Sequence, residues 1–152
     1  MGLVYVFSRI TRAEAALLAE APDATDDLLE SLHGRDDLPS GDLDKAWDGL
    51  RCLLTAALDF DLLREDETST REDCLTVWSP DEIAIAAAVL AATPFDHLAE
   101  HFSPELMDAE GALPDIWDEE WSLGYLRDAY DVLRIFFTHA ATTDSAALAR
   151  FE

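Results

Sequence analysis

The 152-residue chain has no asparagine or glutamine, one lysine, two cysteines and six glycines. With so little glycine it has no loop of the kind that cradles nucleotide phosphates, so we expect no cofactor. The longest apolar run, Ile83 to Ala92, is half of the about 20 residues that a bilayer requires. Cys52 and Cys74 form no C-x-x-C pair, which is typical of a reducing compartment. We therefore expect a cytoplasmic protein with no membrane partner.

Positive charge is also scarce, because 10 Lys and Arg stand against 33 Asp and Glu, a formal net charge of −23. Residues 72–126 contain 13 acidic residues and neither lysine nor arginine. Such a chain has no basic cluster to release counterions from nucleic acid, and anionic membranes repel it. Two interpretations stay open. The acidity reflects a high-GC genome or adaptation to high salt, or it forms a surface that captures a basic partner.

The chain is rich in apolar residues. Hydrophobic residues make up 49% of it, with four Trp and seven Phe, which excludes a disordered chain. A chain of this length buries about 69% of its unfolded surface on folding. No internal repeat or linker divides it. We expect a single domain over residues 1–152.

Local patterns predict alternating helices and strands. Thr11 with Glu14, and Ser79 with Glu82, are capping boxes that begin helices. The predicted strands are 3–10, 74–78 and 146–151, and the predicted helices are 11–20, 25–33, 42–58, 79–92, 93–102, a turn or two from 103, and 122–141. Residues 34–41, 59–73 and 109–120 are predicted to be irregular. The fold class is α+β, with several helices packed on a small, mainly antiparallel sheet.

Four segments carry a family resemblance: DLDKAWDGLRCLLT, WSPDEIAIAAAVLAA, PELMDAEGALPDIWDEE and YLRDAYDVLRIFFTHAA. Their order and spacing resemble the YfbM-like family, a bacterial domain of unknown function, over nearly the whole chain. The most specific pieces are residues 44–47 and 114–117. The resemblance implies a stand-alone, cytoplasmic α+β domain and brings no activity. Two departures are the acidic loop 59–73, where the family has a glycine-rich stretch, and Leu113 in place of a tyrosine.

His97 and His101 lie in an H-x-x-E-H pattern, which resembles the zinc motif of inverzincins. A zinc ion would need a third ligand, and Glu105 or Asp108 is the nearest candidate. The interpretation we favour is a pair of solvent-facing histidines on a polar helix stripe. We therefore expect no metal site.

The motifs around the single lysine are the candidate binding site: Lys45, Trp47, Asp115, Trp117 and Asp118. One interpretation is structural, with Lys45 in an ion pair with a carboxylate of residues 109–120. The other is functional, with the two Trp rings as pocket walls and Lys45 as an anion hook. On a helix the side chains of Lys45 and Trp47 leave the axis about 200° apart, which favours the structural interpretation.

The absence of catalytic motifs favours a protein that is not an enzyme and acts by protein–protein contact. The most concrete form is capture of a basic partner, as an immunity or antitoxin-like protein would do. The alternative is a small-molecule-binding or hydrolytic domain with a pocket near Lys45 and Trp117. The sequence leaves the oligomeric state open.

Overall fold

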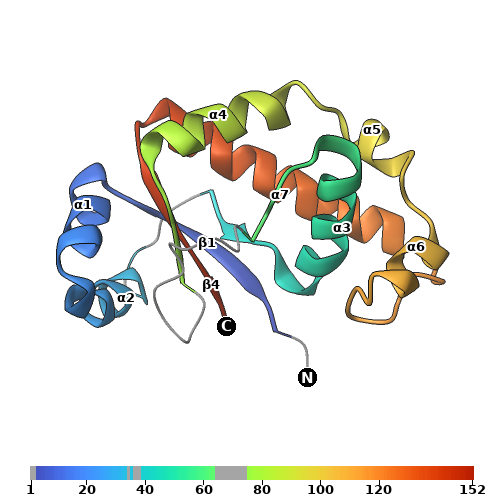
Figure 1. Cartoon of the computed structure of the whole chain (residues 1–152), viewed down its shortest axis with the longest axis horizontal. Coiled ribbons are helices and arrows are strands. Elements are labelled where there is room, and N and C mark those ends of the chain that lie inside the picture. The colour runs from blue at the N-terminus through green and yellow to red at the C-terminus, as the bar shows by residue number, and fades with distance from the viewer. Residues whose placement is uncertain (1–2, 34, 36–38, 64–74) are drawn as a thin grey trace.

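The computed structural model describes residues 3–33, 35, 39–63 and 75–152. A four-stranded antiparallel sheet lies at its centre, in the order β2-β1-β4-β3. The strands are β1 (Tyr5–Ile10), β2 (Gly41–Asp42), β3 (Thr76–Trp78) and β4 (Ala146–Phe151). The two long strands, β1 and β4, pair along their whole length (Figure 1), and beyond them Val4 and Glu152 exchange backbone hydrogen bonds.

The last strand, β4, is buried on both of its faces. Ala146, Ala147, Leu148 and Ala149 are all buried, because β4 lies between β1 and β3 and helices cover both sides of the sheet. A strand buried on both faces does not alternate between apolar and polar residues. This explains why the predicted strand 146–151 is confirmed although its alternation is poor.

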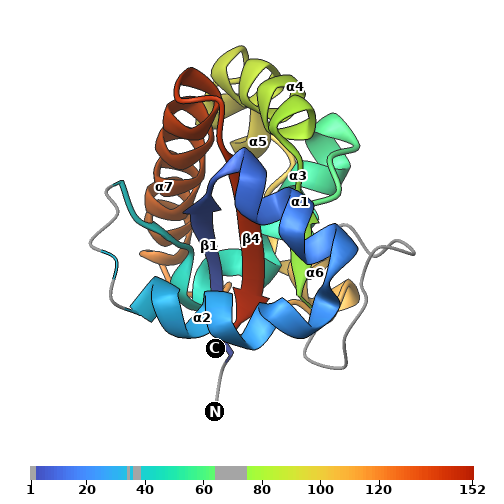
Figure 2. The same cartoon turned by 90° about the vertical axis from the view of Figure 1, so that its left-hand side faces the viewer.

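Two short helices cover one face of the sheet (Figure 2). They are α1 (Arg12–Glu20) and α2 (Thr25–His33), joined by a 3₁₀ turn, η1 (Pro22–Ala24). Leu18 of α1 and Leu32 of α2 pack with Ile10 and Leu148 of the sheet to form a small core. The predicted capping box is confirmed, because the Thr11 side chain accepts from the Glu14 N–H and the Glu14 side chain accepts from the Thr11 N–H.

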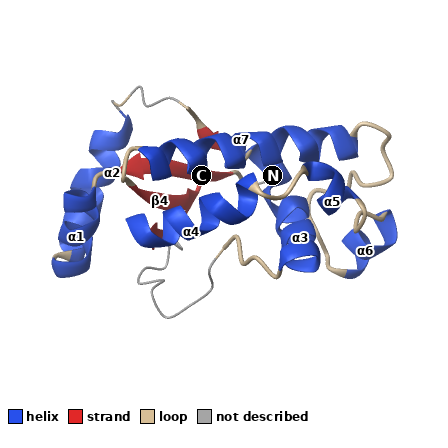
Figure 3. Ribbon diagram, turned by 90° about the horizontal axis from the view of Figure 1, so that it is seen from above, coloured by secondary structure: helices blue, strands red, loops and turns tan. Residues whose placement is uncertain are grey.

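The other face carries the main core and the remaining helices (Figure 3). These are α3 (Trp47–Leu58), α4 (Pro80–Ala91), α5 (Phe95–Ala99), α6 (Pro104–Ala109) and α7 (Ser122–Thr142). The longest helix, α7, packs along α4, and the fully buried Tyr130 joins them by donating its hydroxyl to the Thr93 carbonyl at 2.8 Å. The second predicted capping box, Ser79 with Glu82, begins α4. The predicted α+β class is therefore confirmed.

The helix predicted over residues 42–58 begins later than expected. Gly41 and Asp42 form the missed strand β2, residues 44–46 form a 3₁₀ turn, η2 (Asp44–Ala46), and α3 begins at Trp47. Only glycine fits at position 41, because a Cβ there would lie 2.3 Å from the Phe7 carbonyl oxygen. The Asp42 carboxylate accepts from the Asp44 N–H at 2.8 Å, so it caps the turn rather than the α-helix.

Several acidic side chains have cationic partners. Among the described residues, ion pairs join Arg12 to Asp144, Arg35 to Glu14, Arg51 to Asp48, Arg127 to Asp96, and Arg150 to Glu152. Each such pair is neutral, so the net charge of −23 is unchanged by them and repels itself in the folded state.

We expect the urea midpoint of unfolding at pH 7 to rise with NaCl, because the Debye length falls from about 30 Å at 0.01 M to about 3 Å at 1 M. A midpoint that stays flat or falls would show that the acids are compensated locally.

Candidate functional site

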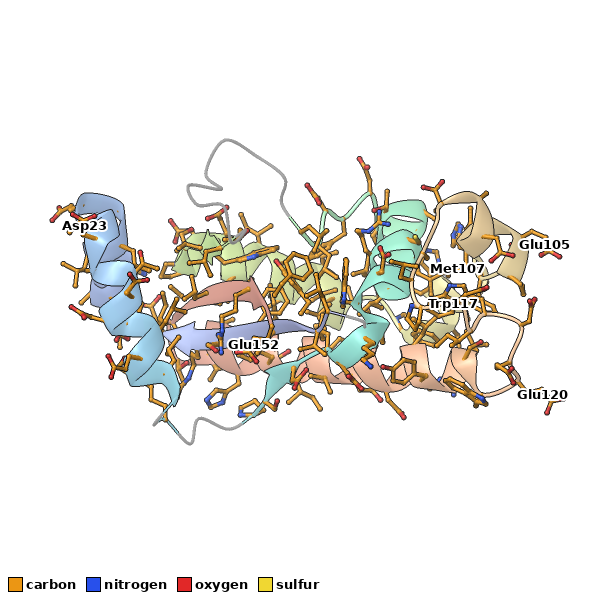
Figure 4. All side chains as sticks on the ribbon, turned by 90° about the horizontal axis from the view of Figure 1, so that it is seen from below. Asp23, Glu105, Met107, Trp117, Glu120 and Glu152 are labelled. Atoms are coloured by element: carbon orange, nitrogen blue, oxygen red, sulfur yellow. The ribbon has the colours of Figure 1, made fainter. Side chains whose placement is uncertain are left out.

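Trp117 is a buried core residue. Its indole N–H donates to the Ala112 carbonyl at 3.0 Å. Its ring lies against Gly49 of α3, where a Cβ would come within 2.3 Å of the ring. Trp117 and Met107 are at the end of the molecule formed by α3 and α6 (Figure 4). The ring therefore fills the space between the acidic segment and α3.

Trp47 packs in a different place, at the first turn of α3. Its ring contacts those of Tyr5 and Phe151, with centroids 6.1 and 4.9 Å apart, and its N–H donates to the Leu3 carbonyl at 2.8 Å. Trp47 thus packs on strand residues near the chain ends, while Trp117 packs on the Gly49 side of the helix. The structure does not bring the two rings together, and their role in binding stays a prediction.

Lys45 lies on the 3₁₀ turn η2 with its side chain exposed. The expected ion pair is wrong: within the described chain, which includes all of residues 109–120, Lys45 pairs with no carboxylate. Asp115 and Asp118 are exposed as well. The neighbouring Asp44 accepts instead from the Tyr125 hydroxyl at 3.1 Å. Partial burial and this carboxylate raise the pKa of Tyr125 to about 12.

A carboxylate on α3, rather than the lysine, holds the acidic segment. The buried Asp48 accepts from the Leu113 backbone N–H at 2.9 Å through Oδ2. Its Oδ1 accepts from Arg51, at 2.8 Å from Nε and 2.7 Å from Nη2. Asp48 is not among the site residues predicted from the sequence, although an acidic residue three positions before an arginine on a helix signals such a pair.

The two histidines of the H-x-x-E-H pattern are exposed. Their ring centroids are 5.9 Å apart, and His97 Nδ1 is 3.9 Å from a Glu100 carboxylate oxygen. Among the described residues, no group of three or more His, Cys, Asp and Glu is placed to hold a metal ion. The third ligands considered for zinc, Glu105 and Asp108, are therefore not brought into such a group.

The outer side of α4 is an exposed apolar surface. Its inner side is buried, and its solvent side carries Ala84, Ile85, Ala88 and Val89. Ile85 is 70% exposed and Val89 is 38% exposed. A surface helix normally has polar residues on its solvent side. The sequence feature that indicates this apolar surface is the run 83–92, which has no polar residue.

A groove of about 330 Å³ runs beside this face. Its apolar lining consists of Ile85, Ala86 and Val89 of α4 together with Phe60 and Trp78. The two rings are stacked, with centroids 6.1 Å apart and planes at 20°.

The end of α3 places Phe60 in the groove. Asp59 takes a left-handed conformation (φ 53°), and the Phe60 N–H returns to the Leu54 carbonyl at 3.2 Å. This turn brings Phe60 against β3 and α4 and so completes the apolar lining.

The groove has an acidic rim. Asp59, Asp61 and Glu82 complete its described lining. Asp81 is exposed in the first turn of the same helix. We call this surface the α4 groove: the acidic residues Asp59, Asp61, Asp81 and Glu82, and the apolar residues Phe60, Trp78, Ala84, Ile85, Ala86, Ala88 and Val89.

The fold defines a class of small α+β proteins with a four-stranded antiparallel sheet between two layers of helices. The chain belongs to the family described as a domain of unknown function, DUF1877, whose profile matches residues 1–149. The predicted resemblance to the YfbM-like family is thereby confirmed.

A crystal structure of YfbM from Escherichia coli, described as a protein of unknown function, has the same fold. Its TM-score is 0.71 and its sequence identity 22%, over 99% of each chain. No curated protein matches the chain. No helix in the described ranges is long and apolar enough to cross a membrane.

Proposed function

We propose that the protein is a non-catalytic interaction domain that binds a basic, amphipathic helix of a partner protein in the α4 groove. The exposure of Ile85 beside an acidic rim carries this proposal. It corresponds to the immunity or antitoxin-like capture of a basic partner predicted from the sequence, in the cytoplasm. Burial raises the pKa of the Cys52 thiol and so disfavours the nucleophilic thiolate.

The apolar part of the surface suits a helical partner. Within the α4 groove, Ala84, Ile85, Ala88 and Val89 form an exposed apolar ridge on α4, and Ile85 and Val89 also line the hollow beside it. Helix-in-groove recognition uses such a surface, with apolar anchors at i, i+3, i+4 and i+7 of the incoming helix. Contiguous exposed apolar residues rimmed by polar ones are typical of interaction sites.

The charge of the rim selects a basic partner over a second copy of this chain. A two-fold dimer would place the same surface on both sides of the interface. The rim of Asp59, Asp61, Asp81 and Glu82 would then face its own copy, which like-charge repulsion disfavours. Lysine and arginine flanking an apolar helix stripe would complement this rim.

Two synthetic helices of about 18 residues, five turns each, test the proposal. They share one apolar leucine stripe, and the polar positions are lysine in one and glutamate in the other. Binding is measured by fluorescence anisotropy in low salt and again in NaCl. We expect the lysine peptide to bind, its affinity to fall with salt, and the glutamate peptide to stay free.

The double variant Ile85→Ser/Val89→Ser should bind the lysine peptide at least about tenfold more weakly than the wild-type protein does. The reason is that each buried aliphatic side chain contributes about 1.5–3 kcal/mol to binding. The control is Ile135→Ser, because Ile135 is also exposed (57%) but lies on α7 outside the α4 groove. Equal affinity for both variants, or equal binding of the two peptides, would refute the proposal.

A further inference from the structure

A second hollow lies on the outer side of α7, beside the end of α4. Its volume is about 630 Å³, within the range of small-molecule sites. Six of its described lining residues belong to α7, one is Ala91 at the end of α4, and the remaining one is Pro39. The polar side chains of the described lining all come from α7: Asp131, Arg134, Thr138, His139 and Thr142. The hollow shares no residue with the α4 groove and is therefore a separate candidate site.

Helical spacing brings an acid, a base and an apolar side chain together in this hollow. Asp131 and Arg134 are three positions apart on α7, a spacing that places Cβ atoms about 5–6 Å apart on one side of a helix. Ile135 follows Asp131 by one turn of the same helix and is 57% exposed. All three residues line the hollow.

The guanidinium group of Arg134 is held in place without a carboxylate. It lies over the ring of the buried Tyr130, 5.5 Å from the ring centroid, and this cation–π contact fixes its position. Within the described chain Arg134 makes no hydrogen bond or ion pair, and its Nε is buried without an acceptor. In a chain with 33 acidic residues, an arginine without a carboxylate is unexpected.

Asp131 also lacks a partner of opposite charge in the described part of the chain, although Arg134 is one turn away. The stacking on Tyr130 orients the guanidinium so that the two side chains form no ion pair with each other. The hollow therefore presents a separate positive and a separate negative group beside an exposed aliphatic side chain.

We propose that this hollow binds an apolar α-amino acid as its zwitterion. The ligand carboxylate accepts from the Arg134 guanidinium, whose planar fork matches two carboxylate oxygens. The ligand ammonium donates to the Asp131 carboxylate, and the ligand side chain packs on Ile135. The net charge of −23 favours a ligand without net charge over a simple anion, which the field of the protein repels.

Titration of the protein with L-leucine at pH 7, followed by amide NMR, tests the inference. We expect saturable shifts of the backbone amides of residues 131–142. Two analogues keep the side chain: isocaproate has no amine, and isoamylamine has no carboxylate. Each should bind about tenfold or more weakly than leucine, because each lacks one charged hydrogen-bonding group. Absence of saturable shifts with leucine, or equal affinity for leucine and either analogue, would overturn the proposal.

Two variants assign the two ends of the ligand. Arg134→Gln should weaken leucine binding about tenfold and abolish the preference for leucine over isoamylamine, because the charged partner of the carboxylate is gone. Asp131→Asn should weaken leucine binding similarly and abolish the preference for leucine over isocaproate. The matched controls are Arg127→Gln and Asp128→Asn, which remove the same charges from α7 outside the hollow.

Unfolding midpoints establish that each variant is folded. If Arg134→Gln does not fold, because the contact with Tyr130 is lost, the exposed Asp131 decides alone. Wild-type affinity for leucine in Asp131→Asn would overturn the inference, as would an equal loss of affinity in the two control variants.

Discussion

Replacing Trp117 by alanine is expected to lower the free energy of unfolding by about 3–5 kcal/mol. The ring is buried between α3 and the segment before α7, and its N–H bond to Ala112 would be lost as well. Alanine would leave a cavity that the surrounding helices fill only in part. Urea unfolding followed by far-UV circular dichroism measures the loss. A change below about 1 kcal/mol would show that the ring is not part of the core.

Gly49 provides the control for this prediction. In the wild-type protein, Gly49→Ala should destabilise by about 1–3 kcal/mol, because the new Cβ would lie 2.3 Å from the Trp117 ring. In the Trp117→Ala background the space is open, so the same change should stabilise α3 by up to about 1 kcal/mol through helix propensity. The sign of the effect reverses between the two backgrounds. The same sign in both would contradict the contact.

Elements specified by neighbouring residues were predictable from the sequence. The caps at Thr11 and Ser79 depend on a partner three residues away, so α1 and α4 begin where the pattern predicts. β2 was not predictable, because Gly41 forms a strand only where Phe7 passes beside it. Asp44 takes a left-handed conformation (φ 52°), so α3 begins only at Trp47, a boundary that helical periodicity alone does not show.

The candidate sites were also predictable only in part, because they depend on tertiary contacts. The motif containing Trp117 was found, but a buried tryptophan and one that lines a pocket give the same sequence pattern. The α4 groove was missed because an apolar helix reads as a buried one until its neighbours are placed.

The second large stability effect is expected at Asp48. Asp48→Ala should cost about 2–4 kcal/mol, because it leaves the Arg51 guanidinium without its carboxylate and the Leu113 N–H without an acceptor. This loss of stability is smaller than the loss expected for a fully buried ion pair, because the Arg51 side chain is 29% exposed and water reaches it. Urea denaturation at pH 7 gives the difference.

Two further variants separate the role of Asp48 from its charge alone. Asp48→Asn keeps one oxygen for the Leu113 N–H, so it should lose less stability than Asp48→Ala. Asp115→Ala removes an equal charge from the exposed part of the same acidic segment and should change stability by about 0.5 kcal/mol or less. If Asp48→Ala and Asp115→Ala lowered the free energy of unfolding by the same amount, residues 109–120 would be held by Trp117 alone. A clear difference assigns the attachment of residues 109–120 to a buried carboxylate, which is the reverse of the lysine–carboxylate contact that the sequence predicts.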